Sequence, residues 1–368
     1  MKSKYLDIAT DGDKLQNSRS VGLDIIRVCA ILFVIGSHFF LHTSFNSATF
    51  HGAPMFFLSM LATLTLINVP LFMMLTGYLN VNKRVSKKYY KGCIRVIVAY
   101  VFFSLVTIVF RELYLGEHYT PVQWFLKITD FSAIPYAWYI ELWIGLFLLT
   151  PFLNILWKGI ETKRNKRILI ITLFICSAFP DFLNRYGVHL VPGYWEEAAY
   201  PLCFFYIGSY IREYQPKCNV RKTALAILGL CLINPVANLI ISFISPRPML
   251  HLIGDGNGIV GIPLATLFFL MCYKAKVSDL RVRNALMRVS LLALDMYLVS
   301  YIFDRLWHPY FRNLIGDDIT ALGPYYPIII GVIAASSFLA AWAKDIFFNS
   351  AGKLYGSIFS AKPDKVLS

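Results

Sequence analysis

Charged residues are scarce in this chain. Only 15% of its 368 residues are Asp, Glu, Lys or Arg, whereas soluble domains have about 25%. Hydrophobic residues make up 57% of the chain and aromatic residues 16%. This composition excludes an ordinary soluble enzyme and predicts a protein that crosses a membrane several times. The formal net charge of +14 does not indicate nucleic-acid binding, because the basic residues lie between the apolar runs, where they determine membrane topology.

Other common sequence features are missing too. Residues 1–20 lack the apolar core of a cleavable signal peptide, so we expect the first apolar run to remain as a helix. None of the seven cysteines lies in a predicted outer loop or has zinc-site spacing, so we expect neither a structural disulfide nor a metal site. No internal repeat, low-complexity tract or appended soluble domain is apparent.

Long apolar runs are the main feature of the sequence. About 20 apolar residues in a helix cross a ~30 Å hydrocarbon core. This criterion predicts an all-α integral membrane protein, a bundle of about ten transmembrane helices. The predicted spans lie near residues 22–44, 54–80, 96–115, 138–157, 168–183, 198–213, 223–245, 259–274, 289–307 and 327–349. The fifth and sixth runs are short, and if both are re-entrant the chain has eight full spans.

The distribution of Lys and Arg predicts the orientation. Basic residues gather in the connections 81–95, 158–167, 211–222 and 274–288, and the alternate connections carry most of the acids. The positive-inside rule therefore places both termini in the cytoplasm. We expect a cytoplasmic N-terminal tail over residues 1–20, a membrane domain over 21–350 and a cytoplasmic C-terminal tail over 351–368.

The first apolar run carries Arg27 and His38, eleven residues apart. On an α-helix this separation is about 20° more than three full turns and about 16 Å of rise, so the two side chains share a face. Such a face can hold an anion near the cytoplasmic boundary and support proton chemistry deeper in the membrane. A second interpretation stays open, in which Arg27 is an interfacial anchor paired with Asp24. His42 follows His38 by one turn, a spacing that is only a weak zinc signal.

Further segments extend this pattern over most of the chain. They are VPLFMMLTGYL (69–79), KKYYKGCIRVIVAY (87–100), AWYIELWIGLFLLTPFL (137–153), FFYIGSYI (204–211) and LLALDMYLVSYIF (291–303). Together with Arg-x10-His, this ordered set resembles the bacterial acyltransferase-3 family of integral membrane enzymes. The chain departs from the family pattern at Gly92, which breaks an Arg-x-x-Arg pair, and at Thr76, Tyr136 and Ser300, where the family commonly has Ser, His and His.

The resemblance implies a membrane O-acyltransferase, most often an O-acetyltransferase, of the bacterial inner membrane. Such an enzyme moves an acyl group from cytoplasmic acyl-CoA to a hydroxyl of a surface polysaccharide or of a lipid-linked glycan precursor. On this basis Arg27, Lys91 and Arg95 hold the CoA phosphates, and His38 is the general base on the acceptor hydroxyl. No permanently bound cofactor and no nucleic-acid partner are expected.

Other polar groups in the apolar runs are candidates for the site. Ser37, Thr76 and Tyr78 are candidate donors to the developing oxyanion, and Trp138, Tyr139, Thr76 and Tyr78 are candidate substrate contacts. Glu141 lies one turn after Trp138; it orients His38 or binds a sugar hydroxyl, unless it is solvated at the outer interface.

Two further acidic features have simpler interpretations. Asp304 is expected to pair near Arg305 at the outer surface. The segment GYWEE (193–197) offers aromatic faces and carboxylates suited to a sugar, although an interfacial aromatic belt is the favoured interpretation.

Two other functional classes compete with the enzyme. Polar residues inside a polytopic bundle also mark transport pathways, so a transporter or flippase of a glycan-related substrate is the main alternative. The missing repeat and the ordered family segments count against it. A membrane sensor is disfavoured because no soluble output domain is apparent.

Overall fold

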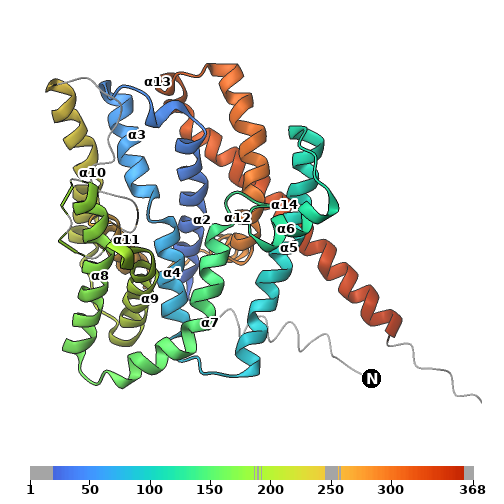
Figure 1. Ribbon diagram of the computed structural model, residues 1–368, viewed down its shortest axis with the longest axis horizontal. Helices are drawn as coiled ribbons and strands as arrows, with labels where there is room; N and C mark the ends of the chain where they lie inside the picture. The colour runs from blue at the N-terminus through green and yellow to red at the C-terminus, as the bar shows by residue number, and fades with distance from the viewer. Residues whose placement is uncertain are drawn as a thin grey trace, which may run out of the picture.

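The computed structural model describes residues 20–185, 187–188, 190–191, 193–244, 256 and 258–359, and these residues form helices joined by turns and loops (Figure 1). The helices are α2 (Val21–Leu41), α3 (Gly52–Thr65), α4 (Asn68–Asn80), α5 (Lys87–Leu115), α6 (Pro121–Thr129), α7 (Trp138–Gly159), α8 (Lys163–Arg185), α9 (Glu196–Tyr214), α10 (Val220–Ile244), α11 (Gly261–Cys272), α12 (Leu280–Ile315), α13 (Ile319–Leu322) and α14 (Tyr326–Phe359). Short 3-10 turns η1 (Ser44–Asn46), η2 (Gly193–Trp195) and η3 (Gly323–Tyr325) lie between them.

Each of the ten predicted spans coincides with helix. Seven stretches of the described chain are long and apolar enough to cross a membrane: 21–41, 52–80, 87–115, 138–159, 220–244, 280–315 and 319–348. The other three runs correspond to α8 and α9, which carry several charged residues, and to α11, which is only 12 residues long. The chain is therefore an all-helical, multi-pass protein, and the count of ten and the cytoplasmic termini stay predictions.

The second predicted span is not one continuous helix. It is divided into α3 and α4 at Leu66 and Ile67. Pro70 explains the break, because proline has no backbone N–H with which to bond the carbonyl of Leu66, four residues earlier. The predicted span near 54–80 therefore consists of two helices within the apolar stretch 52–80.

Helices α4 and α9 approach each other closely through two glycines. A Cβ atom on Gly77 would overlap the carbonyl oxygen of Phe205, and one on Gly208 would overlap that of Met74. Small residues permit such close backbone contact between membrane helices. This contact fixes α4, the helix that carries Thr76.

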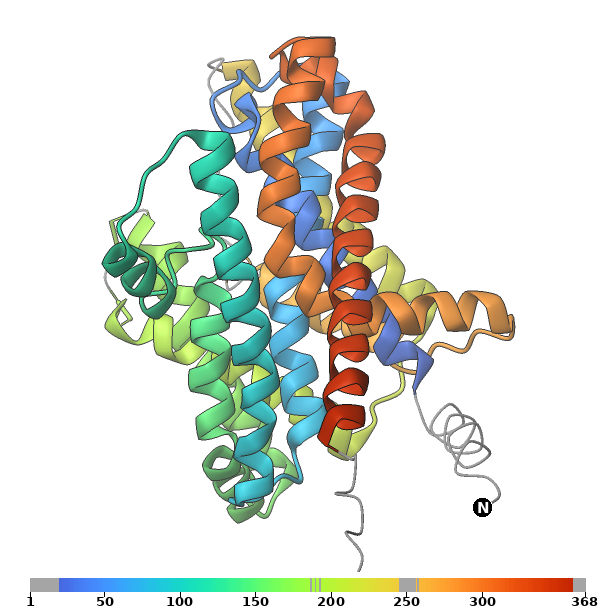
Figure 2. The same cartoon turned by 90° about the vertical axis from the view of Figure 1, so that its right-hand side faces the viewer.

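Helix α2 lies in the interior of the bundle and packs against α12, α4 and α14 (Figure 1). Its buried apolar face includes Ile26, Ile31, Ile35 and Phe39, each with no exposed surface. Helix α14 runs beside α12 (Figure 2). The predicted outer connection 245–258 lies outside the described residues except at positions 256 and 258, and of the predicted N-terminal tail only Ser20 is described.

Candidate active site

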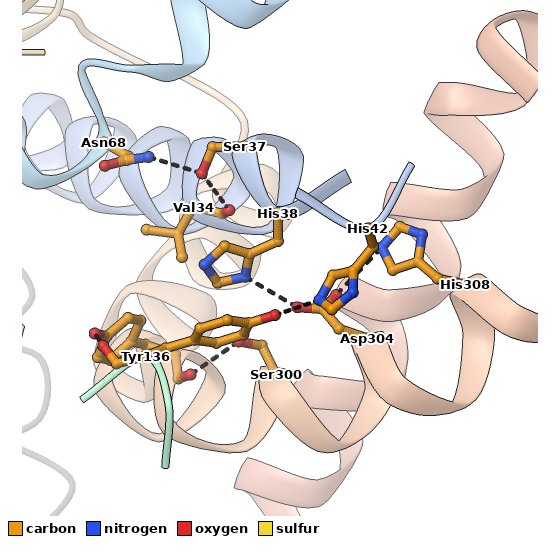
Figure 3. A network of polar contacts seen from close by, with 10 residues as sticks. Val34, Ser37, His38, His42, Asn68, Tyr136, Ser300, Asp304 and His308 are labelled. Carbon is orange, nitrogen blue, oxygen red and sulfur yellow. Dashed lines mark hydrogen bonds and ion pairs between the residues drawn. The ribbon is translucent and has the colours of Figure 1, made fainter. Parts of the chain in front are cut away.

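A buried imidazole–carboxylate pair joins α2 to α12. His38 Nδ1 lies 2.9 Å from Asp304 Oδ2 (Figure 3). Asp304 has no exposed surface and His38 is only 7% exposed. A carboxylate only accepts hydrogen bonds, so the proton of a neutral His38 sits on Nδ1 and the lone pair on Nε2. The pair therefore presents one basic nitrogen away from the carboxylate.

Two more histidines surround the same carboxylate. His308, one turn after Asp304 on α12, places its Nε2 3.6 Å from Asp304 Oδ1. This separation is within ion-pair range but too long for a hydrogen bond. The His42 ring stacks on His308 with 4.9 Å between centroids and 22° between planes. Burial, partly opposed by the charge of Asp304, lowers the pKa of His42 to about 4, so its imidazole is neutral near pH 7.

Tyr136 covers His38. It lies in the connection before α7, and its ring centroid is 3.7 Å from that of His38. Its hydroxyl is 2.5 Å from His42 Nε2, and its carbonyl oxygen accepts a hydrogen bond from the Tyr297 hydroxyl. Burial raises the pKa of Tyr136, so the phenol stays protonated. These contacts fix Tyr136 as a wall over the imidazole (Figure 3).

A cavity of about 450 Å³ holds Arg27 and is called the Arg27 cavity here. Arg27 NH1 donates to Ser290 Oγ at 3.1 Å and lies 3.5 Å from Asp24 Oδ1. Its side chain is 26% exposed. Arg95 and Lys344 also line the cavity. Three cations from α2, α5 and α14 thus line one space together with the carboxylate of Asp295, which pairs with Lys344, so the lining keeps an excess of positive charge that suits an anionic ligand.

Aromatic rings close the Arg27 cavity on the side toward His38. Tyr139, Phe72 and Tyr297 all line it. The Tyr139 ring centroid lies 5.9 Å from that of Phe72 and 5.9 Å from that of Tyr297. Tyr297 also bonds the backbone of Tyr136, so one of the rings that line the cavity contacts the residue that stacks on His38.

A second cavity, of about 660 Å³, is lined by residues of α2, α3, α4, α7, α9, α10 and α11 and is called the Trp138 cavity here. Ser37, the residue before His38, lines it together with Asn68. Asn68 Nδ2 donates to Ser37 Oγ at 3.0 Å, and Ser37 Oγ donates to the Val34 carbonyl at 2.8 Å (Figure 3). Helix α2 therefore contributes Ser37 to this cavity and Arg27 to the other, and His38 itself lines neither of the two.

A protein-family model described as an acyltransferase domain matches residues 20–342, which include both His38 and Asp304. The chain belongs to the acyltransferase-3 family. Comparisons with curated proteins and with solved structures found no match. Family membership and the seven apolar stretches together identify a multi-pass membrane acyltransferase.

Several of the predicted site residues line one of the two cavities. Arg27, Arg95, Thr76 and Tyr139 line the Arg27 cavity, and Trp138 lines the Trp138 cavity. The alternative pairing of Arg27 with Asp24 is present as well, so Arg27 both pairs with Asp24 and lines the cavity.

Other predicted residues lie elsewhere. Lys91 and Glu141 are exposed and line neither of these two cavities. Tyr78 packs under the guanidinium of Arg212, 5.2 Å from its ring centroid, and also lines neither. The hydroxyls of Ser37 and Thr76 donate to carbonyls of their own helices. Among the described residues no group of three or more His, Cys, Asp and Glu is placed to hold a metal ion.

Asp304 is the candidate site residue that sequence reasoning missed. Its predicted surface pairing near Arg305 is wrong, because Asp304 is fully buried against His38. The available signal was a carboxylate and a histidine at i, i+4 within an apolar run, Asp304 and His308. Lys344, near the end of the last predicted span, was missed as a cavity residue, and its ammonium lies 2.9 Å from both oxygens of Asp295.

Proposed function

We propose that this acyltransferase is an O-acyltransferase, most often using acetyl groups, that transfers the acyl group from cytoplasmic acyl-CoA to a hydroxyl of a surface polysaccharide or its lipid-linked precursor. It lies in a bacterial inner membrane with both termini in the cytoplasm. The observation that carries the proposal is the buried His38–Asp304 pair beside a cavity that contains Arg27. The acyl-CoA donor, the acceptor and the membrane follow from the family resemblance together with the positions of the basic residues.

The Arg27 cavity supports the role of donor site. Guanidinium groups form bidentate contacts with phosphate oxygens, so Arg27 and Arg95 are suited to the CoA phosphates. Lys344 supplies a third cation in the cavity, the place that sequence reasoning gave to the exposed Lys91. Arg27 and His38 are separated by eleven residues of α2, a rise of about 16 Å. The extended arm of the donor spans this rise and brings its thioester to the wall beside His38.

His38 then acts as the general base. Its Nε2 takes the proton from the acceptor hydroxyl as the oxygen attacks the thioester carbonyl carbon. The tetrahedral intermediate collapses with cleavage of the carbon–sulfur bond, and the imidazolium returns the proton to the departing thiolate. Asp304 keeps the Nδ1–H tautomer and stabilises the imidazolium, the role of a carboxylate in acyl-transfer triads. General-base catalysis of this kind contributes about 10²–10⁴-fold.

The test is an acyl-transfer assay on the purified full-length protein in nanodiscs, with labelled acetyl-CoA as donor and a mixture of methyl glycosides as the source of the acceptor hydroxyl. Wild type is expected to release CoA, His38→Ala to bind acetyl-CoA without releasing CoA, and Arg27→Ala to lose acetyl-CoA binding. Lys158→Ala, at an exposed position near the end of α7, is the matched control for loss of a cation.

An inert wild type, or His38→Ala and Arg27→Ala variants with wild-type rates, contradicts the mechanism. A protein that binds acetyl-CoA without turnover and moves a glycan-related solute across vesicles supports the transporter alternative instead.

A further inference from the structure

The Trp138 cavity has no role in the donor half of the reaction. It lies among α2, α3, α4, α7, α9, α10 and α11, and three of these helices, α2, α4 and α7, also line the Arg27 cavity. On α4, Pro70 lines the Trp138 cavity and Phe72 the Arg27 cavity; on α7, Trp138 and Tyr139 divide in the same way. These helices therefore separate the two spaces, and one of them, α2, carries His38. Chemistry at His38 needs a second reactant, so the Trp138 cavity is a candidate for the site that binds it.

The walls of the Trp138 cavity combine aromatic faces with hydrogen-bonding groups. Trp138 is 53% exposed although it lies in a largely apolar segment, and Tyr200 adds a second ring. Glu197 supplies a carboxylate, and Asn68 supplies an amide. A sugar ring has one apolar face and an edge of hydroxyls, which matches flat aromatic surfaces beside a few polar groups. The volume of about 660 Å³ lies within the range of about 300–1,000 Å³ typical of small-molecule sites.

The polar end of the cavity contacts α2 at the residue before His38. Ser37 precedes His38 directly, and its hydroxyl accepts a hydrogen bond from Asn68. Asn68 is fixed in turn, because its Oδ1 accepts a hydrogen bond from the backbone N–H of Val69 at 2.5 Å. The Ser37–Asn68 pair is therefore held rigidly at the break between α3 and α4. A ring that hydrogen-bonds this pair contacts α2 at the residue before His38, on the side of the helix away from the imidazole (Figure 3).

Resting on the proposed function, we propose that the Trp138 cavity is the acceptor site and that it takes an uncharged sugar ring, stacked on Trp138 and hydrogen-bonded to Glu197 and the Ser37–Asn68 pair. The Glu197 carboxylate accepts hydrogen bonds from ring hydroxyls. The same charge repels a uronate or phosphate group on the sugar, so it selects against anionic acceptors. The two cavities thus divide their ligands by charge, with the polyanionic donor on the Arg27 side and the neutral ring on the Trp138 side.

The experiment supplies the nanodisc protein with labelled acetyl-CoA and a panel of methyl glycosides: glucose, galactose and N-acetylglucosamine as neutral rings, and glucuronate and galacturonate as anionic ones. At least one neutral glycoside is expected to accept acetyl, and its matched uronate is expected to accept at least tenfold less. Octyl and methyl glycosides of the same sugar separate the sources: a lower KM for the octyl form assigns a lipid-linked acceptor, and equal values assign a free glycan.

Two variants test the residues. Trp138→Ala is expected to raise the KM for the neutral glycoside about tenfold, with the KM for acetyl-CoA changed less than twofold. Glu197→Gln is expected to reduce the preference for the neutral ring over its uronate to less than threefold. Trp342→Ala on α14 and Glu161→Gln in the connection before α8, both at exposed positions outside the two cavity linings, are the matched controls.

A turnover-independent readout separates this inference from the proposed function. A diazirine derivative of the neutral methyl glycoside is expected to label peptides that contain Trp138 or Glu197, and unlabelled neutral glycoside, but not uronate, is expected to compete. Labelling without acetyl-CoA turnover refutes the proposed function and retains the sugar site. Equal use of neutral and anionic sugars, variants that act only on the KM for acetyl-CoA, or labelling elsewhere in the chain overturns the assignment.

Discussion

His38 on α2 and Asp304 on α12 face each other inside the bundle, 266 residues apart in sequence and 2.9 Å apart between Nδ1 and Oδ2. The contact fixes both the orientation and the tautomer of the imidazole, because the carboxylate only accepts hydrogen bonds. Arg27, on the same helix as His38, contacts Ser290, which lies on α12 as well. The contacts between α2 and α12 therefore fix the positions of both His38 and Arg27.

The first prediction removes the charge of Asp304. Asp304→Asn keeps the shape of the side chain but allows the amide to donate to Nδ1, which favours the wrong imidazole tautomer and no longer stabilises the imidazolium. We expect the rate of CoA release to fall about 10²–10³-fold, with the KM for acetyl-CoA changed less than threefold. The measurement is steady-state CoA release in nanodiscs with a neutral methyl glycoside present as acceptor.

Control variants distinguish positioning from a general structural defect. Asp304→Glu is expected to recover part of the rate, and Asp130→Asn, at an exposed position at the end of α6, to leave it unchanged. An Asp304→Asn variant that folds and turns over acetyl-CoA at the wild-type rate removes the pair from the mechanism.

The second prediction concerns the support of Arg27. The Ser290 hydroxyl accepts from Arg27 NH1 at 3.1 Å and donates to Asp24 Oδ1 at 2.6 Å. Ser290→Ala removes both contacts, so the guanidinium is held less firmly in the Arg27 cavity. One lost hydrogen bond to a charged group is worth about 1.5–3 kcal/mol, which predicts a KM for acetyl-CoA raised about tenfold or more with kcat changed less than twofold. Ser47→Ala, at an exposed position, is the control; a fall in kcat alone contradicts the assignment.

Helical periodicity was enough to predict the relation between Arg27 and His38. Eleven residues bring both side chains to one face, and both contact α12. The apolar runs also located the helices, because length and hydropathy are local properties of the chain. These local properties predict where a helix lies in the sequence, but not which other helices pack against it.

The partners of these residues depend on packing and were not predictable from local pattern. Asp304 contacts His38 across 266 positions, whereas Glu141, favoured as an intramembrane carboxylate, is exposed on α7. Asp304 and Glu141 are both carboxylates in apolar runs, so the sequence alone does not distinguish them. The packing of α2 against α12 does, because it buries Asp304 against His38. The break before Pro70 was visible in the sequence, since proline removes a backbone donor.

The third prediction is a pH dependence of stability that comes from His42. Burial lowers its pKa in the folded protein to about 4 from the ordinary 6.5. Between these two values the unfolded chain binds more protons than the folded one, so the free energy of unfolding falls as the pH falls through this window. Asp304, His308, His38 and Arg305 act on the same group.

The comparison is between wild type and His42→Gln, whose amide can still hydrogen-bond the Tyr136 hydroxyl. The apparent Tm of detergent-solubilised wild type is expected to drop more between pH 7 and pH 5 than that of His42→Gln. Equal drops in the two proteins contradict a buried neutral His42.

The fourth prediction tests the close contact of α4 with α9. In Gly77→Ala the added methyl group overlaps the carbonyl oxygen of Phe205, which belongs to a helix backbone and has little freedom to move. The reciprocal contact of Gly208 with Met74 means that both helices must separate. Overpacking of this kind costs about 1–3 kcal/mol, and we expect a correspondingly lower midpoint of denaturation in detergent.

Gly229→Ala on α10 is the matched control, because open space surrounds that position and alanine favours the helix by about 1 kcal/mol. Equal effects of the two substitutions contradict the glycine contact. A Gly77→Ala variant that folds is also expected to bind acetyl-CoA more weakly, because Thr76 and Asn80, on the same helix, line the Arg27 cavity.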